Sequence, residues 1–316
     1  MPQTMMIQGT SNRRRRPFAA YSTKRSRRDA RFGILLVAPA IVLLAFVVFY
    51  PLIEAVYMSF HNVNLMNINI STAAGLANYH QLFVDPQFWQ ALWNTVIYVV
   101  SSVVVGLILG MATALVLNEK IPFRNFFRGI ALIPWVVPGV VVALLFLYIF
   151  NSQAGVLDYV LIKLGLTHHF IEWWGSTHNA LGAEIIANVW NQTPFYMLMI
   201  LAGLQTVPLD EYEAATIDGA SLIKRFWYVT LPNIRGILIT VTSLMVIWNF
   251  NSFDTIWATT QGGPIMATTT LSILVYRTAF NALNVGYAAA IGVAWLIVLL
   301  IFSAVYIWSI GGRDAN

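Results

Sequence analysis

The chain has 316 residues, of which 58% are hydrophobic and only 10% are charged. An average soluble domain carries about 25% charged residues, so the composition argues against a soluble enzyme, and disorder would require low hydrophobicity with high charge. The chain has no cysteine, which excludes disulfides, thiolate metal sites and a cysteine nucleophile. The meaning of the net charge of +5 depends on where the charged residues lie.

Continuous apolar segments predict membrane-spanning helices, because a helix needs about 20 apolar residues to cross a bilayer. In chain order, the six predicted spans are residues 32–50, 92–117, 129–150, 185–207, 236–253 and 288–310. The first is too long for the core of a signal peptide and is followed by no cleavage site, so we expect a retained anchor. Strands of a β-barrel would alternate polar and apolar residues instead. The predicted fold is an all-α polytopic membrane protein with six transmembrane helices.

The basic residues predict the orientation of these spans. Sixteen of the 18 lysines and arginines precede the first span or lie in the second loop, the fourth loop or the tail, whereas Lys163 and Arg277 lie on the other side. Cytoplasmic loops carry the excess of basic residues, so both termini are predicted to be cytoplasmic. The expected organisation is a basic cytoplasmic segment at 1–31, a six-span domain at 32–312 and a cytoplasmic tail at 313–316. The arginine run at 13–16 is expected to orient the chain and contact anionic lipid rather than nucleic acid.

Several kinds of chemistry have no support in the sequence. There is no Gly-x4-Gly-Lys-Ser/Thr pattern for a nucleotide, and the five histidines have no spacing typical of a metal site. Acidic residues in or at the edges of the spans are limited to Glu54 and Asp254, with Glu184 at the outer end of the fourth span. Proton pumps and ion exchangers usually place such groups in mid-span. We therefore expect no enzyme and no metal site, and an ion-coupled secondary transporter remains an alternative.

The loop at 208–232 predicts two short helices outside the membrane. Pro208 suits a first helical turn, and three acidic residues follow it where the helix dipole favours negative charge. Gly219 can end the first helix in a left-handed conformation, Ser221 can cap the second, and Pro232 would close the element. These residues alone leave open whether the loop is a docking element or an ordinary interfacial helix.

The same loop resembles a known signature. Glu213-Ala214-Ala215, followed by Gly219 and Leu231-Pro232, is similar to the "EAA" signature in membrane subunits of binding-protein-dependent ABC importers. The segments at 50–51, 75–79, 89–95, 133–138, 190–194, 249–253 and 262–264 resemble the carbohydrate-uptake branch, which includes the maltose transporter membrane subunits. The likeness covers residues 32–312.

The resemblance implies a mechanism and a set of partners. The loop would be a coupling helix seated in a groove of a cytoplasmic ABC ATPase dimer, through Glu213, Ala214, Ala215, Asp218, Gly219, Leu231 and Pro232. A second homologous permease subunit, an extracytoplasmic solute-binding protein and a small sugar would complete the importer in the inner membrane of a bacterium or archaeon. ATP and Mg would be used by the ATPase, and this chain would bind no cofactor.

Polar and aromatic residues of the fourth and fifth spans are the candidates for the solute path. A sugar site needs hydrogen-bonding groups and flat aromatic faces, although the same polar groups can serve helix–helix hydrogen bonds. The candidates are Asn191, Gln192, Phe195, Met245, Trp248, Asn249, Ser252 and Asp254. Trp248, Asn249 and Ser252 are predicted to lie near one helical face. The spans hold no basic residue, which favours a neutral di- or oligosaccharide over the alternatives of glycerol phosphate or another polar solute.

Overall fold

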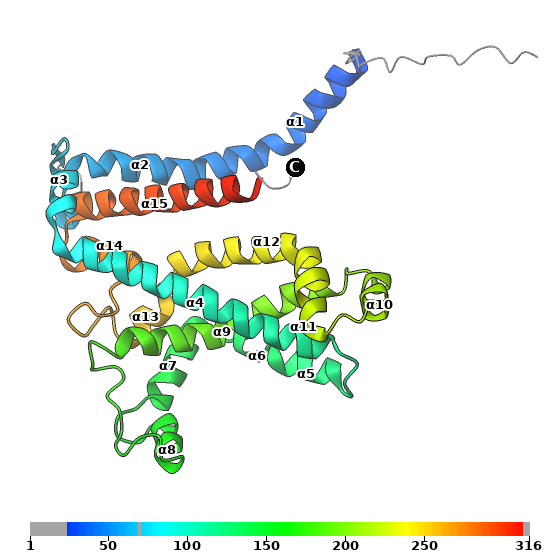
Figure 1. Ribbon diagram of the computed structural model, residues 1–316. Helices are drawn as coiled ribbons and strands as arrows, with labels where there is room; N and C mark the ends of the chain where they lie inside the picture. Colours follow the sequence, from blue (N-terminus) through cyan, green and yellow to red (C-terminus); the bar gives the residue numbers. More distant parts are fainter. Residues whose placement is uncertain (1–23, 69–70, 312–316) are drawn as a thin grey trace, which may run out of the picture. The chain divides into compact units, whose positions relative to one another are not determined.

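The computed structural model describes residues 24–68 and 71–311, with side chains over 32–68 and 71–306. Most of the basic segment 1–31 and the tail 313–316 therefore lie outside the described residues. Within them, the paired strands are β1 (His61–Val63) and β2 (Ser71–Ala73), which form one antiparallel hairpin, and helices make up most of the rest (Figure 1). The predicted all-α class is confirmed.

The chain divides into two units, residues 1–54 and 55–316. The first contains α1 (Lys24–Leu44), the π-helical turn η1 (Ala45–Phe49) and the start of α2 (Tyr50–Ser59). Residues Phe32–Ser59 together are long and apolar enough to cross a membrane. The first predicted span is therefore helical and continues nine residues beyond its predicted end at residue 50.

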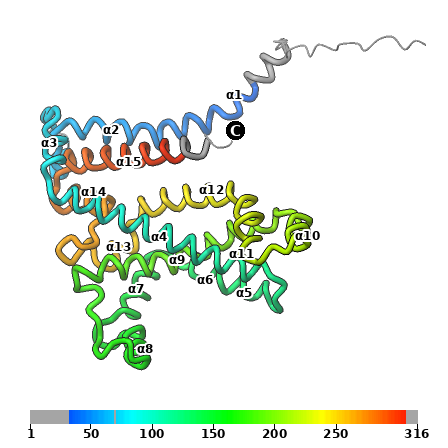
Figure 2. Tube along the Cα trace, viewed as in Figure 1, coloured from blue at the N-terminus to red at the C-terminus, as the bar shows by residue number. Residues whose placement is uncertain are grey.

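The centre of the second unit is formed by three long helices. α4 (Pro86–Asn118) and α9 (Ala180–Leu204) pack along each other, and α12 (Leu231–Phe250) packs against both (Figures 1 and 2). Their buried faces share one large apolar core. The second predicted span lies within α4, and the sixth lies within α15 (Val285–Gly311).

Small residues bring α4 and α9 close together. A Cβ atom added to Gly106 would lie 2.6 Å from Cε2 of Tyr196, and one added to Gly110 would overlap Cβ of the same tyrosine. Tyr196 is fully buried between the two helices. Close contact of this kind drives helix association in membranes, where burial of apolar surface contributes little.

The third predicted span, 129–150, is wrong as a single helix. It is divided into α5 (Arg124–Ala131), α6 (Ile133–Val136) and α7 (Gly139–Ile149), and the axis turns by 95° between Val136 and Gly139. Pro138 lies at the break and forces Val137 into an extended conformation. Pro194, by contrast, does not break α9, which continues through it.

Fewer than six helices meet a simple test of length and apolar composition. Among the described residues, four segments meet it, namely Phe32–Ser59, Pro86–Asn118, Leu222–Thr259 and Val285–Tyr306, and the bent α5–α7 segment can supply a fifth. The fourth predicted span lies in α9, which has 25 residues but carries Asn188, Asn191 and Gln192 near its middle. The total of six spans stays a prediction.

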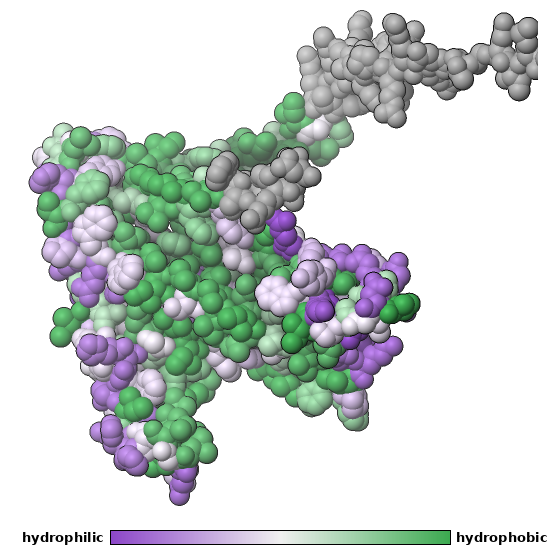
Figure 3. Space-filling view, in the orientation of Figure 1, coloured by the Kyte–Doolittle hydropathy of each residue, from purple (hydrophilic) through white to green (hydrophobic). Residues whose placement is uncertain are grey.

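The remaining elements gather at the two ends of these helices. They are η2 (Leu65–Asn67), α3 (Ala77–Val84), α8 (Val156–Lys163), α10 (Leu209–Ile217), α11 (Leu222–Arg225), η3 (Phe226–Thr230), α13 (Asp254–Thr259), α14 (Leu271–Tyr276) and η4 (Arg277–Asn281). α5, α10 and α11 lie at one end of the second unit, and α3, α8, α13 and α14 lie toward the other (Figure 1). The surface between these ends is mainly hydrophobic, and hydrophilic residues concentrate at the ends (Figure 3).

Candidate functional site

Three amide side chains join α9 to α12. Asn188 Nδ2 donates to Asn249 Oδ1 over 2.6 Å, and Asn249 Nδ2 donates to Gln192 Oε1 over 2.9 Å and to the Met245 carbonyl over 2.7 Å. Asn249 is 2% exposed, and Met245 is fully buried. In this conformation both residues lie inside the helix interface, while Gln192 is half-buried at its edge.

An aromatic row borders this polar cluster. The Phe195 ring centroid lies 5.1 Å from that of Trp248 and 5.6 Å from that of Trp135, so α12, α9 and α6 each contribute one ring. Trp248 is 45% exposed and Trp135 is 40% exposed, so the row has accessible aromatic faces. Such faces pack well on the apolar surfaces of a sugar ring.

Asn191 positions the Trp135 end of this row. Its Nδ2 donates to the Pro134 carbonyl over 2.6 Å and therefore ties α9 to the short helix α6. Asn191 is among the candidates predicted from the sequence, whereas Trp135 is not. The neighbouring prolines mark the segment as irregular, yet nothing local in the sequence places it against Phe195.

Ser252 and Asp254 lie outside this cluster. α12 ends at Phe250, so the prediction that Trp248 and Ser252 share a helical face is wrong. The Ser252 hydroxyl forms a 3.0 Å hydrogen bond with that of Tyr98 on α4. Asp254 begins α13 and is exposed, with its Cβ beside the first residue of α7, Gly139.

A buried carboxyl group lies nearer the other end of α9. Glu184 is fully buried, and its Oε1 accepts a hydrogen bond from Thr259 Oγ1 of α13. Its Oε2 has no hydrogen-bond partner within the described part of the chain. From the sequence, Glu184 is expected at the outer end of a span, but neither its burial nor its contact with α13 can be read from the residues.

The loop at 208–232 follows its local predictions closely. α10 begins directly after Pro208, and Gly219 follows its end with a φ of 73°. Ser221 Oγ accepts a hydrogen bond from the Lys224 amide at the start of α11. The glycine termination and the serine cap are confirmed.

The predicted docking residues lie on two surfaces of the loop. Glu213, Ala214, Asp218 and Gly219 are exposed, and Ala215 is half-buried. Leu231 is half-buried and Pro232 is exposed at the start of α12.

Pro232 does not close the loop, contrary to the prediction. The helix continues from α11 through the π-helical turn η3 into α12, and Pro232 lies in the first turn of α12. The Leu231 amide donates to the Phe226 carbonyl five residues earlier. Pro232 has no amide hydrogen to donate, and it lies directly after the π-helical turn, where the regular α-helical hydrogen-bond pattern is already interrupted. The second short helix of the prediction is therefore the beginning of a much longer one.

Side-chain hydrogen bonds hold α10 against this helix. The hydroxyls of Tyr212 and Thr230 share a hydrogen bond of 2.8 Å, and Asn233 Nδ2 donates to Glu211 Oε2 over 2.6 Å. Arg225 donates from a terminal guanidinium nitrogen to Thr216 Oγ1 over 3.0 Å. A displacement of α10 would therefore act directly on the beginning of α12.

Comparison with known proteins gives a consistent result. The family model described as "Binding-protein-dependent transport system inner membrane component" matches residues 102–309. The sulfoquinovosyl glycerol transport system permease protein SmoG of Agrobacterium fabrum is 35% identical over 90% of this chain and 92% of its own length. The trehalose/maltose transport system permease protein MalF of Thermococcus litoralis is 35% identical over 90% of this chain and 96% of its own.

A solved structure shows the same fold. One chain of a bacterial alginate ABC transporter, crystallised in complex with an alginate pentasaccharide-bound periplasmic protein, superposes with a TM-score of 0.76. The alignment covers 90% of this chain and 94% of that one at 22% sequence identity.

Proposed function

Because this chain belongs to the family of binding-protein-dependent transport system inner membrane components, we propose that it is the permease subunit of an ATP-driven sugar importer. It passes a sugar from an extracytoplasmic binding protein to the cytoplasm by alternating between two conformations. A second, homologous permease subunit and a cytoplasmic ABC ATPase dimer complete the importer. ATP and Mg are used by the ATPase, and this chain binds no cofactor.

The row formed by Trp135, Phe195 and Trp248 supports a sugar as solute. Two of its rings are accessible, and the half-buried Gln192 amide lies beside it to exchange hydrogen bonds with hydroxyl groups. Asn249 then acts as a positioning residue, because its own amide is buried and donates to Gln192. The names of two curated relatives refer to glycosides or disaccharides, which agrees with a di- or oligosaccharide.

The exposed surface of α10 supports docking on an ATPase. Ile217 at its end is 87% exposed, and the acidic Glu213 lies one turn earlier on the same helix. Leu209, Leu222 and Ile223 of the same loop are exposed as well, and several large apolar side chains exposed in one short segment are typical of a surface that a partner covers. We propose that the docking contact includes Glu213, Ala214, Ala215, Asp218 and Gly219, with Leu231 and Pro232 transmitting its movement.

The observation that carries the proposal is the mechanical link from α10 to the aromatic row. Tyr212 and Glu211 are hydrogen-bonded to Thr230 and Asn233, at the beginning of α12. Trp248 lies on the same helix, 17 residues after Leu231, which corresponds to about 25 Å at 1.5 Å per residue. A rigid helix therefore connects the docking element to the proposed solute contact.

The experiment is a comparison of Glu213→Ala with Glu119→Ala in the assembled importer. Both residues are exposed acids at the same end of the molecule, but Glu119 lies outside α10. We expect Glu213→Ala to lose ATP-driven uptake and solute-stimulated ATPase activity while inserting normally, and Glu119→Ala to keep both. Equal activity in the two variants would contradict the docking role of Glu213.

A further inference from the structure

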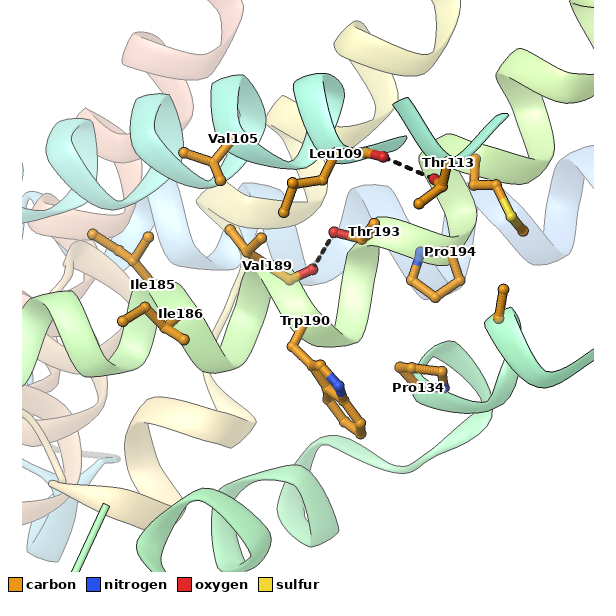
Figure 4. A pocket seen from close by; sticks show the side chains of 12 residues that line it. Val105, Leu109, Thr113, Pro134, Ile185, Ile186, Val189, Trp190, Thr193 and Pro194 are labelled. Carbon is orange, nitrogen blue, oxygen red and sulfur yellow. Dashed lines mark hydrogen bonds between the residues drawn. The ribbon is translucent and has the colours of Figure 1, made fainter. Parts of the chain in front are cut away.

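A hollow lies on the face of α9 that points away from α12. It is a groove of about 460 Å³ between α4, α9 and the α5–α6 segment (Figure 4). The α9 side chains Val189 and Thr193 face it, whereas Asn188 and Gln192 join α12. Its lining is Val105, Leu109, Thr113, Ala131, Pro134, Ile185, Ile186, Val189, Trp190, Thr193, Pro194 and Met197.

The groove offers almost no free hydrogen-bonding group. The Thr113 hydroxyl donates to the Leu109 carbonyl over 2.8 Å, and the Thr193 hydroxyl donates to the Val189 carbonyl over 2.6 Å (Figure 4). Both hydroxyls are thus engaged by their own helices, and most of the other lining side chains are aliphatic. A sugar placed here would lose its hydrogen bonds to water and gain none from the protein, whereas a hydrocarbon chain has no hydrogen bonds to lose.

One wall of the groove continues into a basic helix. Ala131 lines the groove at the end of α5, and Arg128 lies one turn before it. Arg128 donates to the Leu117 carbonyl over 2.7 Å and is therefore fixed at the end of α4. Arg124 is exposed on the same face of α5, and no hydrogen bond or ion pair engages its side chain within residues 24–68 and 71–311, whereas Lys120 lines a different hollow beside α10 and α11.

Exposed aromatic residues accompany these cations. Phe123, Phe126 and Phe127 are all exposed at the beginning of α5, between and beside the arginines. A short helix that carries both cations and large apolar side chains is typical of a segment at the boundary between headgroups and acyl chains.

We propose that this groove binds an anionic phospholipid. One acyl chain lies between α4 and α9, and the headgroup phosphate is held by Arg124, two turns before Ala131 on the same face of α5. The near absence of free polar groups along the groove, with the Trp190 indole N–H as the exception, selects a hydrocarbon chain, and the exposed cation selects an anionic headgroup over a zwitterionic one. The site is separate from the aromatic row and does not depend on which solute the protein carries.

The absence of native cysteine allows a direct test on the full chain. Val105→Cys places a single thiol in the groove, and Val104→Cys places one on the exposed surface of the same helix outside it. Each thiol is labelled with a fluorophore, and the protein is reconstituted in membranes in which either phosphatidylglycerol or phosphatidylcholine carries bromine on its acyl chain. A brominated chain quenches the fluorophore on contact, so quenching reports which lipid occupies the labelled position. At position 105 we expect phosphatidylglycerol to bind with about fivefold preference, the factor for one cation near an anionic lipid. At position 104 we expect no preference.

Charge variants complete the test. Arg124→Gln should abolish the preference at position 105, whereas Lys163→Gln, which removes a cation near the ring of Tyr159, should leave it unchanged. Equal preference at positions 104 and 105, or a preference that survives Arg124→Gln, would overturn the proposal. Absence of quenching at 105 by either lipid would show that a protein segment fills the groove, and displacement by inorganic phosphate alone would show a free-anion site. Either result would also refute it.

Discussion

The hydrogen bond between Asn188 and Asn249 gives the sharpest test of how α9 and α12 are held together. Asn249→Ala removes the acceptor of the hydrogen bond from Asn188 Nδ2 and the donor of the hydrogen bond to Gln192. Asn188 is only 3% exposed, so its amide has no access to water. A buried polar group that loses its partner costs about 1–3 kcal/mol, while the half-buried Gln192 can bond to water instead. We therefore expect Asn249→Ala to destabilise the fold by about 1–3 kcal/mol.

A double-mutant cycle isolates the pair itself. Inter-helix hydrogen bonds in membrane proteins contribute about 0.6 kcal/mol on average and at most about 1.7 kcal/mol. The separation of 2.6 Å places this bond among the shorter ones, so we expect a coupling energy of about 0.6–1.7 kcal/mol between Asn188→Ala and Asn249→Ala.

The assay is reversible unfolding of the purified chain in mixed micelles of increasing denaturing-detergent content, followed by circular dichroism. Asn251→Ala is the matched control, because Asn251 is exposed and its side chain bonds only to the Ile247 carbonyl of its own helix. It should change stability by less than about 0.5 kcal/mol. Additive effects of Asn188→Ala and Asn249→Ala, with no coupling energy, would refute the described pairing of α9 with α12.

Three further substitutions test other parts of the account. Gly219→Ala should lower the melting temperature, since a left-handed residue with a Cβ costs about 1–2 kcal/mol. The control Gly129→Ala, inside α5 and facing open space, should keep or raise the melting temperature. Equal shifts in the two variants would contradict the left-handed conformation of Gly219. Gly110→Ala should destabilise the fold by about 1–3 kcal/mol, because the added Cβ would overlap Tyr196. Gly182→Ala, whose added Cβ has nothing near it, should leave the stability unchanged. Equal thermal unfolding of the two variants would contradict the close packing of α4 on α9. Trp135→Ala should raise the half-saturating sugar concentration for uptake about two- to tenfold, which corresponds to the energy of one aromatic contact. The control Trp93→Ala, an exposed tryptophan on α4, should leave that concentration unchanged. Unchanged transport kinetics in Trp135→Ala would show that Trp135 does not belong to the solute path.

Local features of the loop at 208–232 could be predicted because a few residue types have strong conformational preferences. Gly219 adopts the left-handed conformation that its position after a helix indicated, and Ser221 caps the next helix as its side chain favours. The role of Pro232 could not be predicted in the same way, because proline is found both after a helix and in its first turn. The π-helical turn before it decides between the two.

The helix breaks show the limit of hydropathy. Pro138 coincides with a 95° bend, yet Pro194 lies within the continuous helix α9. Both occur in apolar segments, and neighbouring helices in a membrane can compensate for a lost backbone hydrogen bond. Proline content alone therefore does not locate a break, and the surrounding packing determines it.

The orientation of individual polar side chains was the other limit. Trp248 and Asn249 are adjacent, and their periodicity does not indicate which of the two faces the helix interface, because apolar residues flank both. The structure buries Asn249 and exposes Trp248. Likewise, Trp135 meets Phe195 because α6 packs against α9, a tertiary contact that no local pattern predicts.

The central proposal is that movement of a sugar through this protein is driven by a separate ATPase acting on α10. The most direct measurement is sugar uptake into sealed proteoliposomes containing this chain with its partner permease and ATPase, supplied with the binding protein outside and ATP inside. The account predicts uptake that requires ATP, persists when ion gradients are collapsed and is lost in Glu213→Ala. Uptake that continues without ATP and disappears with the ion gradient would contradict it and identify an ion-coupled secondary transporter.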